Sequence, residues 1–264
     1  MAEPVPPTPP ADLFSVAGKT VVVTGGTRGI GRMIAGGFVA GGARVIVSSR
    51  KADAVDATVA ELSEFGEVTG IPSDLSTEDG ARAFAEAVTA GHDRLDVLVN
   101  NAGATWGAPL AEHDAASWGR VLDLNVQGIF HTTKFLLPLL QAVGTAEVPA
   151  RVINIGSIDG IQVPTLETYS YSASKAAVHQ LTRHLAKHLA PAITVNAVAP
   201  GPFESKMMAA TLDAFGDQIA ATAPLRRIGR PDDMAGVALF LASRAGSYLT
   251  GTIIPVDGGI ATTA

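Results

Sequence analysis

Three side chains in the second half of the chain could together reduce a carbonyl group. Tyr171 and Lys175 stand four residues apart in the stretch YSASK, so on a helix both side chains project from one face. An ammonium beside a phenol favours the phenolate and lowers a pKa that is ordinarily about 10. Ser157, at the end of a short apolar run, adds a hydroxyl that can donate a hydrogen bond to a carbonyl oxygen as that oxygen gains charge. We expect acid–base chemistry at a carbonyl.

A glycine-rich turn, TGGTRGIG, follows the first apolar run and could bind a phosphate. Gly25, Gly29 and Gly31 carry no Cβ atoms, so backbone N–H groups at a helix N-terminus can approach an anion closely. The spacing is neither the G-x-G-x-x-G fingerprint nor a Walker loop, because Arg32 and Met33 follow the last glycine. A tight strand-to-helix connection without a ligand is the alternative interpretation.

The elements that must position these residues follow from the hydrophobic pattern. Short apolar runs predict strands at 20–24, 43–49, 67–74, 95–101, 151–157, 193–200 and 252–259. Apolar residues at three- and four-residue intervals predict helices at 31–42, 53–65, 78–91, 117–140 and 174–190. This alternation predicts an α/β fold, a doubly wound Rossmann-type three-layer sandwich with a seven-stranded parallel sheet. Ligands of such sheets bind beyond the carboxyl ends of the strands, where the candidate residues fall.

The composition limits the class of protein. A chain of 264 residues that is 47% hydrophobic can bury a large core, and we expect one dinucleotide-binding catalytic domain over 15–264. With 25 acidic against 19 basic residues, a net charge of −6 and no basic run, the chain is not expected to bind nucleic acid. The absence of cysteine excludes disulfides, thiolate catalysis and cysteine zinc sites, and it fits a reducing compartment.

Two segments depart from this alternation. Residues 1–14 form a Pro-rich tail without the features of a signal peptide, and we expect it to be mobile because its prolines cannot pack as a helix. The apolar stretch 126–144 contains Lys134 and Pro138 and is too polar for a membrane span, so we expect a soluble cytoplasmic protein. An insert at about 200–230 is predicted to be an ordered substrate loop, because it contains Met207, Met208, Leu212, Phe215 and Ile219.

The motifs, in their order along the chain, resemble those of the short-chain dehydrogenase/reductase family. TGGTRGIG resembles its cofactor turn, with Thr24 bracing the turn, and NNAG at 100–103 resembles its structural motif. PGPFESKM resembles the segment that closes over the nicotinamide, and DGG the closing signature. The resemblance covers nearly the whole chain after the tail. It implies a nicotinamide-dependent oxidoreductase with a catalytic tetrad of Asn125, Ser157, Tyr171 and Lys175.

The resemblance also implies a role for each member of the tetrad. Tyr171 would be the acid/base, and Lys175 would hold the cofactor ribose and lower the tyrosine pKa. Ser157 would polarise the carbonyl, and the main chain at Asn125 would seat a proton-relay water.

The cofactor can be argued from charge. An NAD-binding domain of this kind has Asp or Glu at the end of the second strand, whereas this strand ends in Ser48, Ser49 and Arg50, with Arg28 in the glycine turn. We therefore expect NADP(H), although Arg50 could simply begin a solvated helix. Asp74 resembles the residue that meets the adenine amino group, its alternative being a helix cap. The expected cofactor-binding residues are Gly25, Thr27, Arg28, Gly29, Ile30, Gly31, Ser49, Arg50, Asp74, Leu75, Asn101, Ala102, Gly103, Tyr171, Lys175, Pro200, Gly201, Phe203 and Ser205.

The substrate is the least determined part of this interpretation. Within the family the chain resembles NADPH-dependent 3-oxoacyl reductases of the rhamnolipid-biosynthesis type, through NNAGATWGAPL, ARVINIGS and SKAAVHQLTRHLAKHL among other segments. This resemblance implies reduction of a ketone to a secondary alcohol, with a 3-oxoacyl thioester as substrate. Arg151 is the only base in LQAVGTAEVPAR, where reductases that dock acyl carrier protein have a basic cluster, so docking stays open. Sugar-ketone reduction of the gluconate type and broad carbonyl reduction are the alternatives.

Two further questions concern the kind of protein and its assembly. A cofactor-sensing regulatory protein of this fold is less favoured, because it would be expected to lack at least one tetrad residue. The apolar helices expected around 117–140 and 171–190 predict a homo-oligomer, and the family resemblance implies a homotetramer.

Other conspicuous residues receive simpler interpretations. His184 and His188 have the spacing of a zinc pair, but the stretch lacks the Glu of H-E-x-x-H, so no metal is expected. Tyr169 has Ala173 four residues on and is not expected to be catalytic. Trp106 could line a substrate pocket or simply pack, and His131 is expected in the core or an interface.

Overall fold

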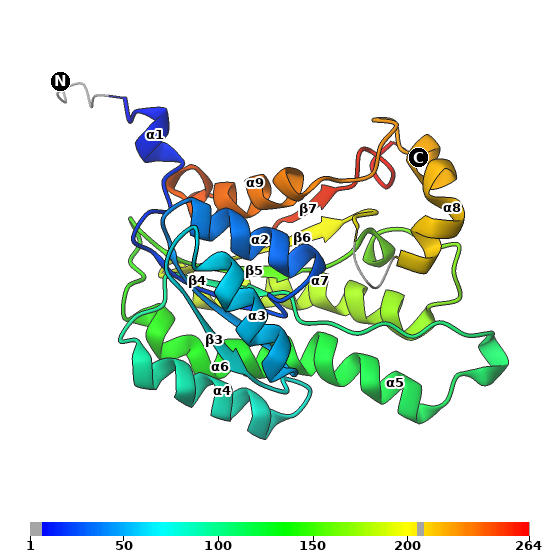
Figure 1. Ribbon diagram of the computed structural model, residues 1–264, viewed down its shortest axis with the longest axis horizontal. Coiled ribbons are helices and arrows are strands. Elements are labelled where there is room, and N and C mark those ends of the chain that lie inside the picture. Colours follow the sequence, from blue (N-terminus) through cyan, green and yellow to red (C-terminus); the bar gives the residue numbers. More distant parts are fainter. Residues whose placement is uncertain (1–6, 205–208, 264) are drawn as a thin grey trace.

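The computed structural model describes residues 7–204 and 209–263, with the backbone alone over 209–215. Its centre is a parallel sheet of seven strands in the order β3-β2-β1-β4-β5-β6-β7 (Figure 1). The strands are β1 Thr20–Thr24, β2 Arg44–Ser49, β3 Val68–Pro72, β4 Val97–Asn100, β5 Ala150–Ile155, β6 Ile193–Pro200 and β7 Ile253–Val256. The strand order reverses between β1 and β4, which is where such folds bind ligands. The predicted fold class and seven-stranded parallel sheet are confirmed.

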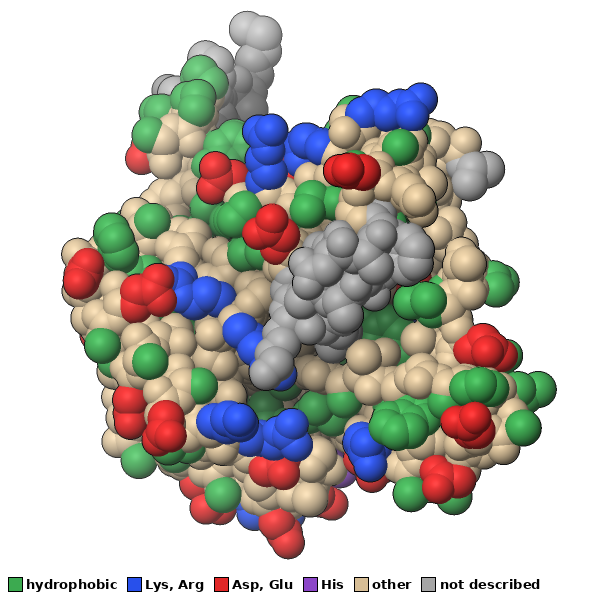
Figure 2. All heavy atoms as spheres, turned by 45° about the vertical axis from the view of Figure 1, so that its right-hand side comes forward, with side chains coloured by type: hydrophobic (Ala, Val, Ile, Leu, Met, Phe, Trp, Pro, Cys, Tyr) green, Lys and Arg blue, Asp and Glu red, His purple; other side chains and the backbone are tan. Residues whose placement is uncertain are grey.

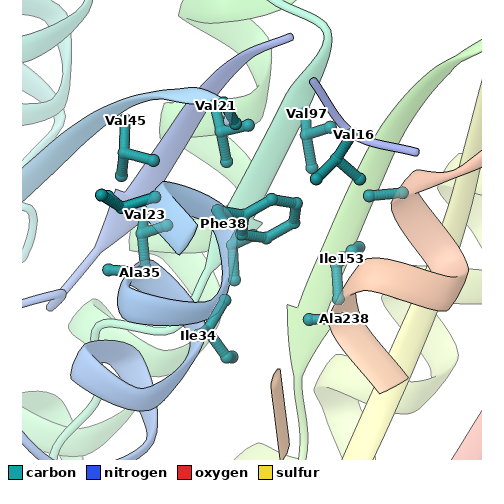
Figure 3. Close-up of a cluster of buried hydrophobic side chains, with 14 of the residues drawn as sticks. Val16, Val21, Val23, Ile34, Ala35, Phe38, Val45, Val97, Ile153 and Ala238 are labelled. Carbon is teal, nitrogen blue, oxygen red and sulfur yellow. The ribbon is translucent and has the colours of Figure 1, made fainter. Parts of the chain in front are cut away.

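Helices cover both faces of the sheet. One cluster of buried side chains joins α2 (Gly29–Ala40), α3 (Ala52–Leu62) and α9 (Pro231–Ala242) to the sheet, and in Figure 3 Phe38 of α2 lies among Val16, Val21 and Val97. A second cluster lies under α4 (Glu78–Gly91), α6 (Ile129–Gln141) and α7 (Tyr169–Leu189). β1, β4, β5 and β6 are buried along their whole length, as expected for strands covered on both faces.

The Pro-rich start contains a helix that the sequence analysis did not expect. Residues Pro10–Leu13 form the one-turn helix α1, and the ring of Phe14 lies 6.5 Å from that of Phe240, between ring centres. The expectation that prolines prevent a helix here is wrong, because Pro10 stands at the first helical position, where a missing N–H needs no partner. Residues 1–6 of the predicted tail lie outside the described residues.

The long helix predicted at 117–140 is interrupted. The structure has α5 (Ala115–Leu122), a π-helical turn η2 (Asp123–Gly128) and then α6. A π-turn accommodates an extra residue within a helix, and such turns are frequent at functional sites. Asn125 lies in this turn and is fully buried. Period-3.6 patterning misses the interruption, since both flanking helices keep apolar faces of their own.

The insert after β6 contains the helix α8 (Ala209–Thr222). Ahead of it, Phe203 forms a bridge with Gly229, so both ends of the insert are tied together. Ser205, Met207 and Met208 lie outside the described residues, as do the side chains of Leu212 and Phe215. Short 3₁₀ turns occur at η1 (Leu110–Glu112), η3 (Ile158–Gly160) and η4 (Arg244–Gly246).

Two surface properties bear on possible partners. In the described part of the chain, no helix combines the length and apolar character needed to cross a membrane. On the face shown in Figure 2, basic, acidic and hydrophobic side chains all occur, and several Lys and Arg side chains lie near one another below the centre of the view. The chain as a whole has a net charge of −6.

Candidate active site

The candidate residues lie at the carboxyl-end edge of the sheet, and Thr24 ties its centre together. Its Oγ1 accepts hydrogen bonds from the backbone N–H groups of Asn101 and Ala102, both 3.0 Å, and donates to the Val99 carbonyl at 3.3 Å. The end of β1 is therefore fixed to the loop after β4. The expected bracing role of Thr24 is confirmed.

The glycine turn between β1 and α2 has a backbone that requires glycine. Gly25 and Gly29 have φ of 64° and 51°, in the left-handed region that other residues rarely adopt. A Cβ on Gly31 would lie 2.3 Å from both Asn101 Nδ2 and the Gly25 carbonyl oxygen. Asn101 Nδ2 itself donates to the carbonyls of Thr24 and Gly25, at 2.9 and 3.0 Å. Asn101 thus holds the shape of the turn, and the N-terminus of α2 opens beside it.

Two arginines and one aspartate lie where β1, β2 and β3 end, and the arginines could bind a phosphate. Arg28, at the N-cap of α2, and Arg50, directly after β2, are both exposed, and neither forms an ion pair with any described residue. Asp74 accepts hydrogen bonds from the N–H and hydroxyl of Ser76, which lower the pKa of its carboxyl, and Arg50 lowers it further. The cap of α4 is Thr77, so the alternative interpretation of Asp74 as the helix cap is wrong.

Asn125 links the loop after β4 to the catalytic helix. Its Oδ1 accepts from the Ala104 N–H at 2.8 Å, and its Nδ2 donates to the Ala104 carbonyl and to Ser174 Oγ, both at 2.9 Å. Ser174 Oγ in turn donates to the Tyr171 carbonyl at 2.7 Å. The side chain of Asn125 therefore positions Ala104 and α7 relative to each other, and its main chain is left for the expected water relay.

Tyr171 and Lys175 stand on one face of α7, as predicted. Lys175 Nζ lies 5.5 Å from the centre of the Tyr171 ring and donates to the Ile155 carbonyl at 2.8 Å. Burial raises the pKa of Tyr171 to about 12, and a hydrogen bond with Ser157 offsets this only in part. Burial also lowers the pKa of Lys175 to about 8. The expected lowering of the tyrosine pKa is wrong, because loss of hydration disfavours both charged forms more than the pair stabilises them.

The raised pKa has a chemical consequence for Tyr171. A phenol with a pKa of about 12 stays protonated at neutral pH. It is therefore in the state required of a proton donor.

Ser157 is held at the end of β5 by the turn that follows it. It is the N-cap of η3, and its Oγ accepts from the Asp159 N–H at 3.1 Å. His179 of α7 is buried beneath this turn, and a Cβ on Gly156 or Gly160 would lie 2.2 or 2.8 Å from its ring. Burial lowers the pKa of His179 to about 4, so the imidazole is neutral at pH 7. The turn and α7 therefore fit together only with glycine on both sides of Ser157.

Asp159 and His179 are residues that the sequence analysis missed. The carboxylate of Asp159 raises the pKa of both Tyr171 and Lys175, so its charge reaches the catalytic pair. Its place two residues after Ser157 was a signal available in the sequence. His179 had a weaker signal, since its spacing of four residues from Lys175 is shared by many helix residues.

The other predicted cofactor residues lie near the same edge with different exposure. Ser49 ends β2, and Gly103 is close enough to Lys175 that a Cβ there would lie 3.9 Å from Nζ. Phe203 is buried and its ring meets Gly229, so its side chain belongs to the core. Ser205 lies outside the described residues. The remaining positions at or beside this edge are Thr27, Ile30, Leu75, Ala102, Pro200 and Gly201.

The conspicuous residues outside the tetrad make mostly local contacts. Tyr169 donates its hydroxyl to Glu167 at 2.8 Å, and the guanidinium of Arg120 lies 5.0 Å above the Trp106 ring. His131 approaches Glu78 at 3.9 Å on the α6 surface. The rings of His184 and His188 stack at 4.8 Å, and no cluster of potential metal ligands occurs among the described residues.

The fold and the site match known proteins. A family model described as enoyl-(acyl carrier protein) reductase matches residues 25–261. The rhamnolipids biosynthesis 3-oxoacyl-[acyl-carrier-protein] reductase of Pseudomonas aeruginosa is 48% identical over 252 residues, 93% of this chain and 97% of that protein. The solved Pseudomonas aeruginosa RhlG/NADP active-site complex is 47% identical, with a TM-score of 0.92 over 95% of this chain and 99% of its own. Galactitol 2-dehydrogenase (L-tagatose-forming) of Cereibacter sphaeroides is 37% identical over 94% of this chain and 96% of its own length.

With this fold, this edge and these relatives, the chain belongs to the short-chain dehydrogenase/reductase family and is an oxidoreductase. The predicted family, and its resemblance to 3-oxoacyl reductases of the rhamnolipid-biosynthesis type, are confirmed.

Proposed function

We propose that the protein is an NADPH-dependent reductase that converts the ketone of a 3-oxoacyl thioester to a secondary alcohol. One observation carries this proposal: Tyr171 and Lys175 stand together on one face of α7, at the same sheet edge as Ser157 and the glycine turn. The relative at 48% identity, a 3-oxoacyl-[acyl-carrier-protein] reductase, supports the substrate class. The neighbour solved as an NADP complex supports the cofactor.

The residues present fit NADP(H). A Cβ on Gly25 or Gly31 would collide with Asn101, so these glycines let the turn close tightly, and N–H groups of α2 would hold the pyrophosphate there. Arg28 and Arg50 would hold the 2′-phosphate through charge-assisted hydrogen bonds. The other residues assigned to the cofactor are Thr27, Ile30, Ser49, Asp74, Leu75, Asn101, Ala102, Gly103, Tyr171, Lys175, Pro200, Gly201, Phe203 and Ser205. When bound, the reduced nicotinamide supplies a hydride to the substrate carbon.

The side chains of this protein supply the proton and stabilise the charge. The Ser157 hydroxyl donates a hydrogen bond to the carbonyl oxygen, which becomes more negative as the carbon is reduced. Tyr171 Oη then gives its proton to that oxygen, and the alcohol forms. The phenolate left on Tyr171 is stabilised by the ammonium of Lys175, whose Nζ is held by the Ile155 carbonyl at 2.8 Å. The main chain at Asn125 would complete the path that returns a proton from solvent.

The proposal includes a homotetramer in the cytoplasm. On α6, Phe130 is 43% exposed, and the half-buried Phe135 has the Arg82 guanidinium 4.3 Å above its ring. A hollow of about 470 Å³ lies beside Phe135 and α4. A second copy packed on α6 and α7 would cover this apolar surface. The absence of cysteine suits a reducing compartment. A monomer mass in light scattering at micromolar concentration would contradict the assembly, and detection of the native protein outside the cytoplasm would contradict the location.

Sugar-ketone reduction is the second candidate, because galactitol 2-dehydrogenase is a 37% identical relative. Arg151 is buried in β5, so the segment before Ser157 presents no exposed base for an acyl carrier protein. A thioester presented without that carrier is therefore the favoured form. The test is kcat/KM with NADPH for 3-oxoacyl thioesters of several chain lengths, sugar ketones and simple ketones. The proposal requires the thioesters to be the best substrates, and preference for a sugar ketone would replace it.

A further inference from the structure

A carboxylate lies at the catalytic centre without a place in the proposed mechanism. Asp159 follows Ser157 by two residues, in the turn η3, which packs against α7. Its backbone is fixed on both sides, because its N–H donates to Ser157 Oγ at 3.1 Å and its carbonyl accepts from Ser172 Oγ at 2.7 Å. The position of this residue is therefore set by the same turn that sets the catalytic serine.

The side chain of Asp159 is left without a partner by this arrangement. Among the described residues none donates a hydrogen bond to its carboxylate and none forms an ion pair with it. It is neither fully buried nor fully exposed. Its turn packs against α7, where a Cβ on the next residue, Gly160, would lie 2.6 Å from the backbone carbon of Lys175. Asp159 therefore lies beside the catalytic pair, and its charge raises the pKa of both Tyr171 and Lys175.

A negative charge at this position discriminates between substrates. The reacting carbonyl oxygen must approach both Ser157 and Tyr171, so groups attached next to that carbonyl come close to Asp159 as well. A substrate carboxylate one carbon away from the ketone would meet a like charge in a partly desolvated site, where such repulsion is strong. An ester or thioester at the same position carries no charge and meets no such repulsion.

We infer that Asp159 is a specificity-determining residue, which makes the site select uncharged carbonyl compounds and reject those with an anionic group next to the reacting carbonyl. The inference rests on the proposed function for its substrate class. It explains how one site can use 3-oxoacyl thioesters and discriminate against the free 3-oxo acids that their hydrolysis produces. The repulsive element is what gives the selectivity.

The test compares a neutral and an anionic substrate with one carbon skeleton. Ethyl acetoacetate and acetoacetate are reduced with saturating NADPH, and the ester-to-acid ratio of kcat/KM is measured for each variant. Asp159→Asn should lower this ratio about tenfold or more, because it removes the charge and keeps the backbone contacts. Asp159→Glu keeps the charge and should keep most of the discrimination. Asp56→Asn removes a charge from the exposed face of α3 and should leave the ratio unchanged.

Two results would overturn the inference. The first is an unchanged ratio in Asp159→Asn, and the second is an equal loss in Asp159→Glu and Asp159→Asn, which would assign the effect to shape. Methyl 2-oxogluconate and 2-oxogluconate serve as a second neutral and anionic pair, because the carboxyl carbon of 2-oxogluconate is bonded directly to the reacting carbonyl. Reduction of the sugars alone would overturn the proposed function, while the Asp159→Asn change in their ratio would still decide the inference. Reduction of neither pair would overturn both.

Discussion

The two halves of the sheet edge bind and react by opposite physical means. Around β1 and β2, the glycine turn offers backbone N–H groups, and the cations of Arg28 and Arg50 are exposed to water. Around β5 and α7, Lys175 is buried and Tyr171 is partly buried, and loss of hydration gives Tyr171 a pKa of about 12 and Lys175 of about 8. Recognition in the first half depends on local backbone shape and accessible charge. Reactivity in the second depends on how far packing removes water, which is a property of the whole fold.

The largest effect is expected from a substitution in the half of the edge around β5 and α7. Tyr171→Phe removes the proton donor and keeps the ring, so kcat for ketone reduction should fall by about 10²–10⁴-fold. The dissociation constant for NADPH, measured by fluorescence titration, should change little, because the exposed half is untouched. Wild-type turnover in the purified variant would contradict the proposed proton donation by Tyr171. A matching loss of cofactor affinity would show that catalysis and cofactor binding do not depend on separate halves of the edge.

The test with the next largest expected effect measures how the burial of Lys175 makes the unfolding free energy depend on pH. Lys175 has a pKa of about 8 in the folded chain against an ordinary value of 10.5, so between these pH values the unfolded chain holds a proton that the folded chain has released. Stability should therefore rise with pH across this window, by about 3 kcal/mol from this group. Lys175→Met should remove most of the rise, measured as the urea unfolding free energy at pH 7, 8, 9 and 10. A smaller rise should remain, because burial also lowers the pKa of Lys19.

A matched control for that measurement lies on the same helix. Lys187 is exposed on α7, so Lys187→Met should leave the pH dependence of the wild type in place. Identical pH slopes in wild type and Lys175→Met would mean that Lys175 is not desolvated, and the contrast between the two halves would disappear.

The exposed half is tested by cofactor preference. Each charge-assisted hydrogen bond to the 2′-phosphate is worth roughly 1.5–3 kcal/mol, so NADPH should exceed NADH in kcat/KM by about ten- to a hundredfold. Arg50→Asp should reverse the preference, because a carboxylate repels the phosphate and accepts from a ribose hydroxyl. Arg244→Asp makes the same charge change in η4 and should not alter the preference. Equal kcat/KM with both cofactors in the wild type would show that Arg28 and Arg50 do not bind the 2′-phosphate and are ordinary solvated side chains.

The smallest effect is expected from a substitution outside both halves of the edge, which should change stability and leave activity unchanged. Thr77 caps α4 by accepting from the Gly80 N–H at 3.1 Å. Thr77→Ala should cost about 1 kcal/mol of unfolding free energy and leave kcat and cofactor preference unchanged. A large loss of activity would indicate that catalysis responds to any loss of stability, and the contrast between the halves would then be less informative.

The sequence predicted the fold and the position of the site because both depend on local patterns. The run TVVVT coincides with β1, and EDGARAFAEAVTAG with α4, since period and capping agree there. The spacing of Tyr171 and Lys175 was enough to place both on one helix face. The strand-end position of Ser157 likewise follows from the apolar run before it.

The sequence could not predict what depends on packing between distant segments. The pKa of Tyr171 is raised where a lowering was expected, because loss of hydration outweighs the effect of Ser157 and the charge of Asp159 raises it further. Asn125 was assigned to a helix, yet its three hydrogen bonds reach Ala104 and Ser174 from a π-turn that no periodicity reveals. Asp159 gains its importance only because η3 rests on α7.

The π-turn η2 has a consequence for how this chain can vary. An α-helix turns by about 100° per residue, so the extra residue in Asp123–Gly128 sets the rotational phase of α5 against α6. Deleting one residue there would rebuild a regular helix, and it would also rotate one helix relative to the other, away from its own buried face. In evolutionary terms the turn acts as a fixed insertion, and sequence length at this point is constrained as strongly as residue type.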